Sequence, residues 1–270
     1  MGVFVYELTY PGTWLREDAF GTDDRRNADA LLRLIGECIE EAALAVNLFN
    51  AAYDASLDLY ETSIERDQLE LYSPSPRTLK DDLAMIPSGL DGDDRFWAEH
   101  NAQQEARRDI LRNRWRGGEW PASYVHHAPY MHARSCVYAL DTIEKSLREL
   151  HDLVASHVDL SRPLDDWAEA FPGLQAVRNS SHHREDRAQV QKFGKPIRLR
   201  PVLTQQINAP EGGLYSTGSL DERGLMVTTS DGHMTRLDIT EETVTTAGGI
   251  VQTVIDLFPW TAGSRRWLPE

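Results

Sequence analysis

Two long segments of the chain, residues 27–59 and 130–158, distribute apolar and polar side chains with the period of an α-helix. Their apolar residues recur at spacings of three and four, which places them on one helical face. These residues are Leu31, Ile35, Cys38, Ala42, Val46, Phe49 and Tyr53 in the first segment, and Ala133, Val137, Leu140, Ile143, Leu147, Leu150 and Val154 in the second. Both segments are predicted to be amphipathic helices.

Weaker patterns predict further helices between and after these two. Residues 72–94 are rich in proline, glycine and aspartate, which predicts a loop, and helix-forming residues then predominate from 94 to about 115. Another helix is expected to start near Pro163 and to be interrupted at 171–173. It should restart with Pro172 in its first turn and extend to about Gln189.

The pattern becomes alternating after Gly194. Apolar or β-branched side chains two residues apart, separated by glycine-containing turns, predict a small antiparallel sheet; they are Ile197 with Leu199, Leu214, Met226 with Thr228, and Leu237 with Ile239. The apolar run at 250–258, preceded by Gly248 and Gly249, predicts a closing helix, and residues 3–8 predict a strand that can join the sheet. The expected fold class is α+β, with a helical domain at 1–194 and a small β-rich α+β domain at 195–270.

The overall charge narrows the choice of partners. The chain carries 28 basic and 43 acidic side chains, a formal net charge of −15. Because non-specific affinity for nucleic acid comes mainly from lysine and arginine, double-stranded DNA is not an expected partner. Residues 101–200, however, hold 16 basic and 13 acidic side chains and most of the histidines. A local patch in this middle third therefore remains available for RNA.

Other sequence features exclude several classes of protein. No apolar run reaches the roughly 18 to 20 residues of a membrane helix, and the first residues lack a positively charged start, so a cytoplasmic protein without membrane contact is expected. Cys38 and Cys136 occupy apolar helix positions, which favours reduced, packed thiols. The chain shows no phosphate-binding loop or dinucleotide fingerprint, and no cofactor is expected.

The segment from Arg178 to His183 carries the clearest candidate chemistry. On a helix, Asn179 and His183 share a face, and Arg178 stands about 100° around from Asn179. A guanidinium can bind a phosphate and stabilise its growing charge, while an imidazole transfers a proton near neutral pH. Since the 2′-hydroxyl of RNA supplies the nucleophile, this trio suits cleavage of RNA without a metal ion. Arg178 and His183 are then expected to be partly accessible and to point into one cleft.

The same residues resemble the motif of the HEPN superfamily. That motif has an arginine, four to six residues, and a histidine, commonly with a polar residue after the arginine, and Arg178, Asn179 and His183 match it. The resemblance covers residues 27–190 as a helical layout and implies an antiparallel helical bundle. It also implies a metal-independent endoribonuclease used as a toxin or in antiviral defence, often a homodimer with a composite cleft, with an antitoxin as a candidate partner.

The resemblance gives each residue of the motif a role. Arg178 would bind and polarise the scissile phosphate, His183 would act as the acid or base, and Asn179 would orient the substrate or His183. His182 is the reserve candidate for proton transfer.

Two other readings of these residues stay open. In the first, the protein is a non-catalytic module that binds RNA or a protein partner, Arg178 forms a surface ion pair with Glu185 or Asp186, and the two histidines only pack. In the second, His126, His127 and His132 join His182, His183 and a carboxylate in a metal site. Their spacing lacks the paired helical arrangement typical of such sites, so no metal ligand is predicted.

An accessory RNA-binding surface is predicted on the helix at 94–115. Its residues place guanidinium groups and an indole on one side, where they could hold phosphates and stack a base: Arg108, Arg112, Trp115 and Arg116. Arg184 is predicted to add to RNA binding beside the motif. The alternative for the helix surface is a solvated face paired with the acidic first helix.

Overall fold

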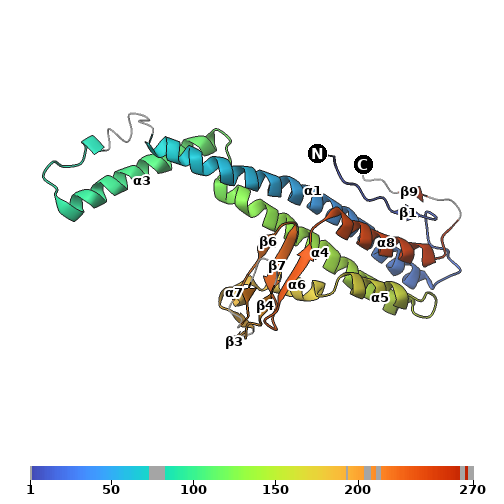
Figure 1. Cartoon of the computed structure of the whole chain (residues 1–270). Helices are drawn as coiled ribbons and strands as arrows, with labels where there is room; N and C mark the ends of the chain where they lie inside the picture. Colours follow the sequence, from blue (N-terminus) through green and yellow to red (C-terminus); the bar gives the residue numbers. More distant parts are fainter. Residues whose placement is uncertain are drawn as a thin grey trace. The chain divides into compact units, whose positions relative to one another are not determined.

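The computed structural model describes residues 2–72, 83–192, 194–203, 208–210, 214–261 and 265–266 (Figure 1). The chain forms two compact units, of which the first comprises Met1–Asn50 with Tyr130–Glu270 and the second Ala51–Pro129. This division does not follow the expected boundary at 194/195, because residues on both sides of it pack within the first unit. Helical and sheet elements coexist, as expected for an α+β protein.

The helices confirm most of the helical patterns. They are α1 (Thr22–Tyr72), α3 (Gly92–Arg116), α4 (Ala122–Val154), α5 (Ser161–Ala170), α6 (Leu174–His182), α7 (Arg184–Ala188) and α8 (Glu241–Leu257). The predicted break at 171–173 is present between α5 and α6, where Gly173 adopts a left-handed conformation at φ 85°. Helix α4 begins earlier than predicted and contains Pro129 in its interior. Whether these helices form a HEPN-type bundle stays a prediction.

The predicted extension of the motif helix to Gln189 is wrong. Helix α6 ends at His182, because His183 has a non-helical backbone with φ −93° and ψ 56°. Its N–H still donates to the carbonyl of Asn179 over 3.0 Å and closes the last turn. A new short helix, α7, then begins at Arg184.

The predicted antiparallel sheet has three strands: β6 (Ser219–Asp221), β7 (Gly224–Thr228) and β8 (Met234–Asp238). Strand β7 is central and buries Leu225 and Val227. In the turn between β7 and β8, Gly232 has φ 87°, and a Cβ there would overlap the carbonyl oxygen of Arg198, so only glycine fits.

Further two-residue strands pair outside this sheet. They are β2 (Gln191–Lys192) with β3 (Lys195–Pro196), and β4 (Val202–Leu203) with β5 (Asn208–Ala209). Two of the alternating segments predicted as strands, those at Ile197/Leu199 and at Leu214, lie in irregular backbone instead. The N–H of Ile197 still donates to the carbonyl of Val190 over 2.9 Å, next to the pairing of β2 with β3.

The prediction that residues 3–8 form a strand of the C-terminal sheet is also wrong. Residues 3–8 form no strand, and Asn47 of α1 bonds the backbone of Phe4 on both sides, at 2.8 Å from its N–H and 2.7 Å from its carbonyl. The strand β1 (Thr9–Tyr10) follows and pairs with β9 (Arg265–Arg266), away from the three-stranded sheet. The side-chain amide of Asn47 thus makes the hydrogen bonds to Phe4 that a neighbouring strand would make in a sheet.

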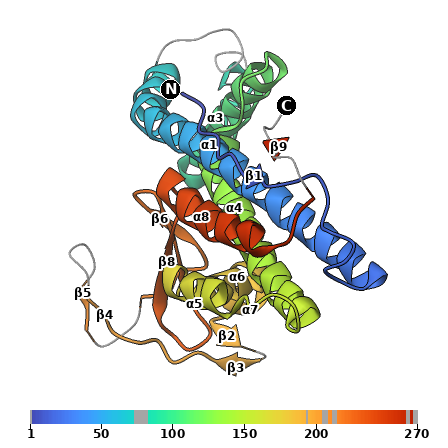
Figure 2. The same cartoon turned by 90° about the vertical axis from the view of Figure 1, so that its right-hand side faces the viewer.

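The core of the first unit joins helices to the sheet. Helix α6 packs on β7 and β8, and α8 packs on α5 and on β1 (Figure 2). The buried faces of α1, α4 and α8 supply Ile35, Phe49, Leu140, Ile143 and Val251, each fully inaccessible to solvent. The stripe predicted for α4 is therefore a core face, and so is that of α1 from Ile35 to Phe49, whereas its ends Leu31 and Tyr53 are only half-buried.

Both cysteines are free and buried, as predicted. Burial raises the pKa of the Cys38 thiol to about 11, with Glu41 and Glu37 adding to the effect, and burial alone raises the pKa of Cys136 to about 12. Neither thiol is therefore poised as a nucleophile. Over the described residues, no helix combines the length and apolar character needed to cross a bilayer.

Gly248 and Gly249 were predicted to precede the closing helix, but they lie inside α8. The two glycines have different surroundings. A Cβ on Gly248 would overlap the ring of Tyr6, whereas one on Gly249 meets nothing within 4 Å.

We expect Gly249→Ala to raise the free energy of unfolding by about 1 kcal/mol, because alanine is the better helix former. Gly248→Ala should lower it by about 1–3 kcal/mol, because Tyr6 is displaced. Urea denaturation measures both; equal gains would contradict the packing of Tyr6 on α8.

Candidate active site

Helix α6 presents the predicted motif at the edge of its buried face. Leu174, Val177, Ser180 and Ser181 are buried, and these positions hold the helix against the sheet. Arg178 and Asn179 lie beside this face and are half-buried, whereas His182 is exposed. The guanidinium side chain of Arg178 is 27% exposed. The motif residues are therefore anchored by their helix and still reach solvent.

Arg178 pairs with a buried carboxylate that sequence reasoning missed. Its Nε lies 3.2 Å from Oδ2 of Asp141, a residue of α4 whose side chain is only 6% exposed. The same oxygen accepts a hydrogen bond from Nζ of Lys145 over 2.6 Å. This contact replaces the surface pair of Arg178 with Glu185 or Asp186 that was considered above. One carboxylate thus serves two cations, which leaves the group of three with a formal charge of +1.

The contact between Arg178 and Asp141 is an ion pair and not a well-aligned hydrogen bond. The buried Nε of Arg178 has no hydrogen-bond partner of good geometry among the described residues, and the hydroxyls of Ser180 and Ser181 share this condition. Each unsatisfied buried polar group costs about 1–3 kcal/mol. Such a group needs an explanation, for example a catalytic role or an ordered water. The two serine hydroxyls fall in this class, whereas the Nε of Arg178 is offset by its ion pair with Asp141.

Asn179 contacts the guanidinium of Arg178 at a different nitrogen from Asp141. Nη1 of Arg178 donates to Oδ1 of Asn179 over 3.0 Å. Asp141 at Nε and Asn179 at Nη1 fix the plane of the guanidinium. No other described residue accepts from its remaining N–H groups, which can meet another acceptor. Asn179 thus contacts Arg178, and its role toward the substrate or His183 stays a prediction.

The two histidines lie at the end of α6, where the backbone leaves the helix. Nδ1 of His183 is 3.5 Å from Oε1 of Glu185, and its side chain is 43% exposed. The ring of His182 packs edge-on against His183, with centroids 5.1 Å apart, and against Tyr138 of α4 at 6.4 Å. A backbone hydrogen bond, aided by His183 and His182, lowers the pKa of the Glu185 carboxyl. Both imidazoles therefore reach solvent beside Arg178.

The expected accessibility of Arg178 and His183 agrees with these exposures. Their side chains have different partners, since Arg178 turns to Asp141 and Asn179 while His183 turns to Glu185. That both point into one cleft stays a prediction.

Sequence analysis missed Tyr138, Asp141 and Lys145, which α4 brings to this site. These positions have the three- and four-residue spacing of one helical face. A usable signal was Asp141 itself, because an aspartate next to Leu140 in an otherwise apolar stripe requires a buried cation as partner.

The predicted accessory surface lies on α3, within the second unit, and its arginines have partners on their own helix. Arg108 pairs with Glu105 at 2.6 Å and Arg112 with Asp109 at 3.0 Å, so these two arginines are solvated and pair within α3 and not with the acidic first helix. Trp115 remains exposed, and Arg116 contacts Asn113. These exposed pairs are weak and can exchange for phosphate contacts, so RNA binding here stays a prediction. The side chain of Arg184 lies outside the described residues.

The histidine-based metal site gains no support. His126 and His127 pack ring against ring, with centroids 5.7 Å apart, and burial lowers the pKa of His132. Within the described part of the chain, no group of three histidine, cysteine or acidic side chains is arranged to hold a metal ion.

The motif resembles that of a known superfamily in six residues, and a motif of this length also occurs by chance. Membership in the HEPN superfamily is therefore carried by Arg178, Asn179 and His183 and stays a prediction. Comparison of the whole chain with protein-family models, with curated proteins and with solved structures gives no match.

Proposed function

We propose that the surface formed by α4 and the end of α6 binds RNA and cleaves it without a metal ion, as a HEPN-type endoribonuclease. The observation that carries the proposal is the fixed guanidinium of Arg178, held by Asp141 and Asn179 next to two exposed imidazoles. A preoriented guanidinium loses little freedom when it grips a phosphate, which favours its use in stabilising a charged transition state.

The charge of the surface also supports an anionic ligand. Asp141 neutralises only one of its two cations, and the side chain of Lys145 is 52% exposed. This places a second positive group next to Arg178 in a chain that is otherwise strongly acidic. RNA would therefore be engaged at a local patch with few phosphate contacts, and its affinity should depend only weakly on salt.

The proposed reaction is an internal transfer at phosphorus. His183 takes the proton from the 2′-hydroxyl, the 2′-oxygen forms a bond to phosphorus, and the bond from phosphorus to the 5′-oxygen breaks. His182 gives a proton to the leaving 5′-oxygen, so the products are a 2′,3′-cyclic phosphate and a 5′-hydroxyl. Arg178 donates to the non-bridging oxygens as their negative charge grows. A homodimer that joins two such sites, and an antitoxin that covers them, stay predictions.

A second candidate function is non-catalytic RNA binding by the same surface. The ion pair of Arg178 with the buried Asp141 favours it, because such a pair also has a structural role. In this case the protein would retain RNA without breaking it.

A cleavage assay in EDTA tests the proposal. We expect wild type to cut a labelled mixed-sequence RNA and to leave the matching DNA intact, since DNA lacks the 2′-hydroxyl. Arg178→Ala and His183→Ala should each lower the rate by about 100-fold or more. His233→Ala is the matched control, because His233 is an exposed histidine that pairs with Asp231 in the β7–β8 turn.

Each result of this assay has a clear meaning. Retention of RNA without cleavage would favour the non-catalytic candidate. Equal activity of all variants would contradict the roles of Arg178 and His183, and a need for added metal would contradict the metal-free reaction.

A further inference from the structure

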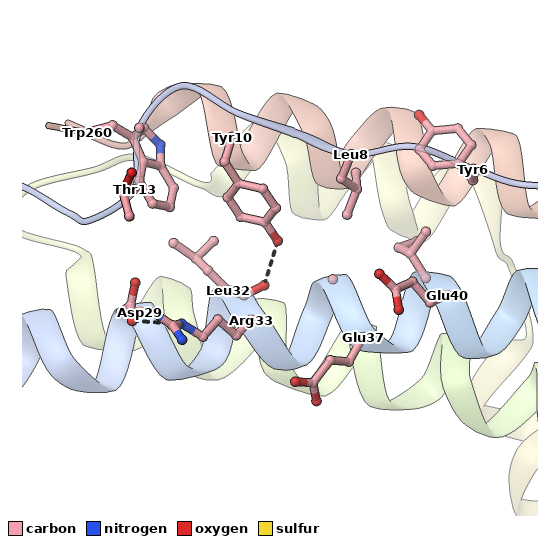
Figure 3. A pocket seen from close by; sticks show the side chains of 13 residues that line it. Tyr6, Leu8, Tyr10, Thr13, Asp29, Leu32, Arg33, Glu37, Glu40 and Trp260 are labelled. Carbon is pink, nitrogen blue, oxygen red and sulfur yellow. Dashed lines mark hydrogen bonds and ion pairs between the residues drawn. The ribbon is translucent and has the colours of Figure 1, made fainter. Parts of the chain in front are cut away.

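A second candidate site lies in the same unit, between the chain's N-terminal segment and α1. Residues 6–13 run along α1 between Asp29 and Glu40 and, together with Trp260, enclose a cavity of about 60 Å³ (Figure 3). About 15 Å³ of such space is needed to hold one water molecule, so this cavity can hold a group of a few atoms. None of the residues proposed for RNA cleavage lines it.

Aromatic and aliphatic side chains form most of the wall. Tyr6, Tyr10 and Trp260 contribute rings, and Leu8 and Leu32 contribute aliphatic surface. The rings of Tyr10 and Trp260 meet edge to face with centroids 5.5 Å apart, which fixes both. Together these side chains can surround an alkyl chain and offer ring faces to a cation.

The hydroxyl of Tyr10 is a neutral part of this wall. It lies 3.4 Å from the carbonyl oxygen of Leu32, to which it donates. Burial, followed by the nearby Glu40, raises the pKa of Tyr10 to about 12, so the ring carries no charge at neutral pH. Gly36 permits this approach of ring to helix, because a Cβ there would stand 2.6 Å from the hydroxyl oxygen.

The charged side chains of the cavity leave an excess of negative charge. Asp29 and Arg33 pair with each other at 3.0 Å, and Arg33 also lies 5.2 Å from the ring of Trp14, so this cation is already engaged. Glu37 and Glu40 also line the cavity, and neither forms an ion pair with another described residue. Figure 3 shows Glu40 on the edge of α1 that faces the N-terminal segment.

We propose that this cavity binds an organic ammonium group at the end of an alkyl chain. The ammonium would sit between Glu40 and the faces of the tyrosines, with Glu37 adding negative charge from the other edge of α1, and the alkyl chain would contact Leu8 and Leu32. A carboxylate would be repelled by the two glutamates. A neutral apolar ligand would remove water from Glu40 without supplying a charge partner, which costs free energy.

The same chemistry has two sources, a free amine and a lysine side chain of another protein. Titration calorimetry on the full chain can use 1,4-diaminobutane for the first and Nα-acetyl-lysine N-methylamide for the second, with butyrate as the anionic control. We expect at least one of the two amines to bind saturably and butyrate not to bind. The amine that binds more tightly identifies the source.

Substitutions locate the binding in the cavity. Glu37→Gln/Glu40→Gln should weaken the amine's affinity by about tenfold or more, because it removes both unpaired carboxylates. The matched control is Glu41→Gln, an exposed glutamate of the same helix that does not line the cavity. Absence of amine binding by wild type up to roughly 10 mM would overturn the proposal. Equal affinities of wild type and the double variant would do the same.

Discussion

Replacement of Asp141 by alanine is expected to lower the free energy of unfolding by about 2–3 kcal/mol. Loss of one partner of a buried ion pair typically costs about 3–5 kcal/mol, because the other charge is left without compensation. Here the expected cost is smaller, since Arg178 is partly exposed and Lys145 can turn to solvent. Urea denaturation followed by circular dichroism measures the change. RNA cleavage should fall in parallel, because Arg178 loses the carboxylate that orients it.

The control for this prediction is Glu144→Ala on the same helix. Glu144 pairs with Arg148 at 2.8 Å, but the arginine is largely exposed, so the expected cost stays below about 1 kcal/mol. Equal costs for the two substitutions would show that the Asp141 pair contributes no more than a surface pair.

A double substitution separates the structural role of the pair from its chemical role. Asp141→Leu/Arg178→Met replaces the buried charges with apolar side chains of similar size, a change that is often neutral for stability. We expect this variant to fold and to lack cleavage activity. Retained cleavage would assign Arg178 to structure alone.

The sequence predicted those parts of the fold in which the spacing of apolar residues within a single helix is sufficient to identify it. The apolar residues of α4 recur so regularly that Val137, Leu140 and Ile143 could be placed in the core without knowledge of their neighbours. Helix α5 and the break before α6 were likewise visible, because proline and glycine act on the local backbone.

The errors arose where a distant residue decides the local structure. Residues 3–8 alternate like a strand, yet Asn47 bonds the backbone of Phe4 and no strand pairs with it. The pair of Gly248 and Gly249 suggested a helix start, although Gly248 is required inside α8 by the ring of Tyr6. Single-residue contacts of this kind leave no periodic signal.

The candidate site, like the fold, was predictable only where its residues lie close together in the sequence. The spacing of Arg178, Asn179 and His183 was legible because all three belong to one short segment. Asp141 and Lys145 come from a helix more than thirty residues earlier, and only the fold of the chain brings them to Arg178. The cavity at Tyr10 depends on Trp260 from the opposite end of the chain, so it could not be predicted at all.

Arg178→Lys should lower RNA cleavage by about 100-fold while the protein stays folded. Lysine keeps the positive charge near Asp141, but its single ammonium cannot contact Asp141 and Asn179 as the guanidinium does and still present a planar pair of donors to phosphate. The measurement is kcat/KM on a labelled RNA, with the free energy of unfolding determined on the same preparations. Arg148→Lys is the control. Arg148 is an exposed arginine of α4, and a lysine in its place can still form the ion pair with Glu144. Cleavage within about twofold of wild type would mean that charge alone suffices, and the orientation of Arg178 by Asp141 and Asn179 would then have no catalytic role.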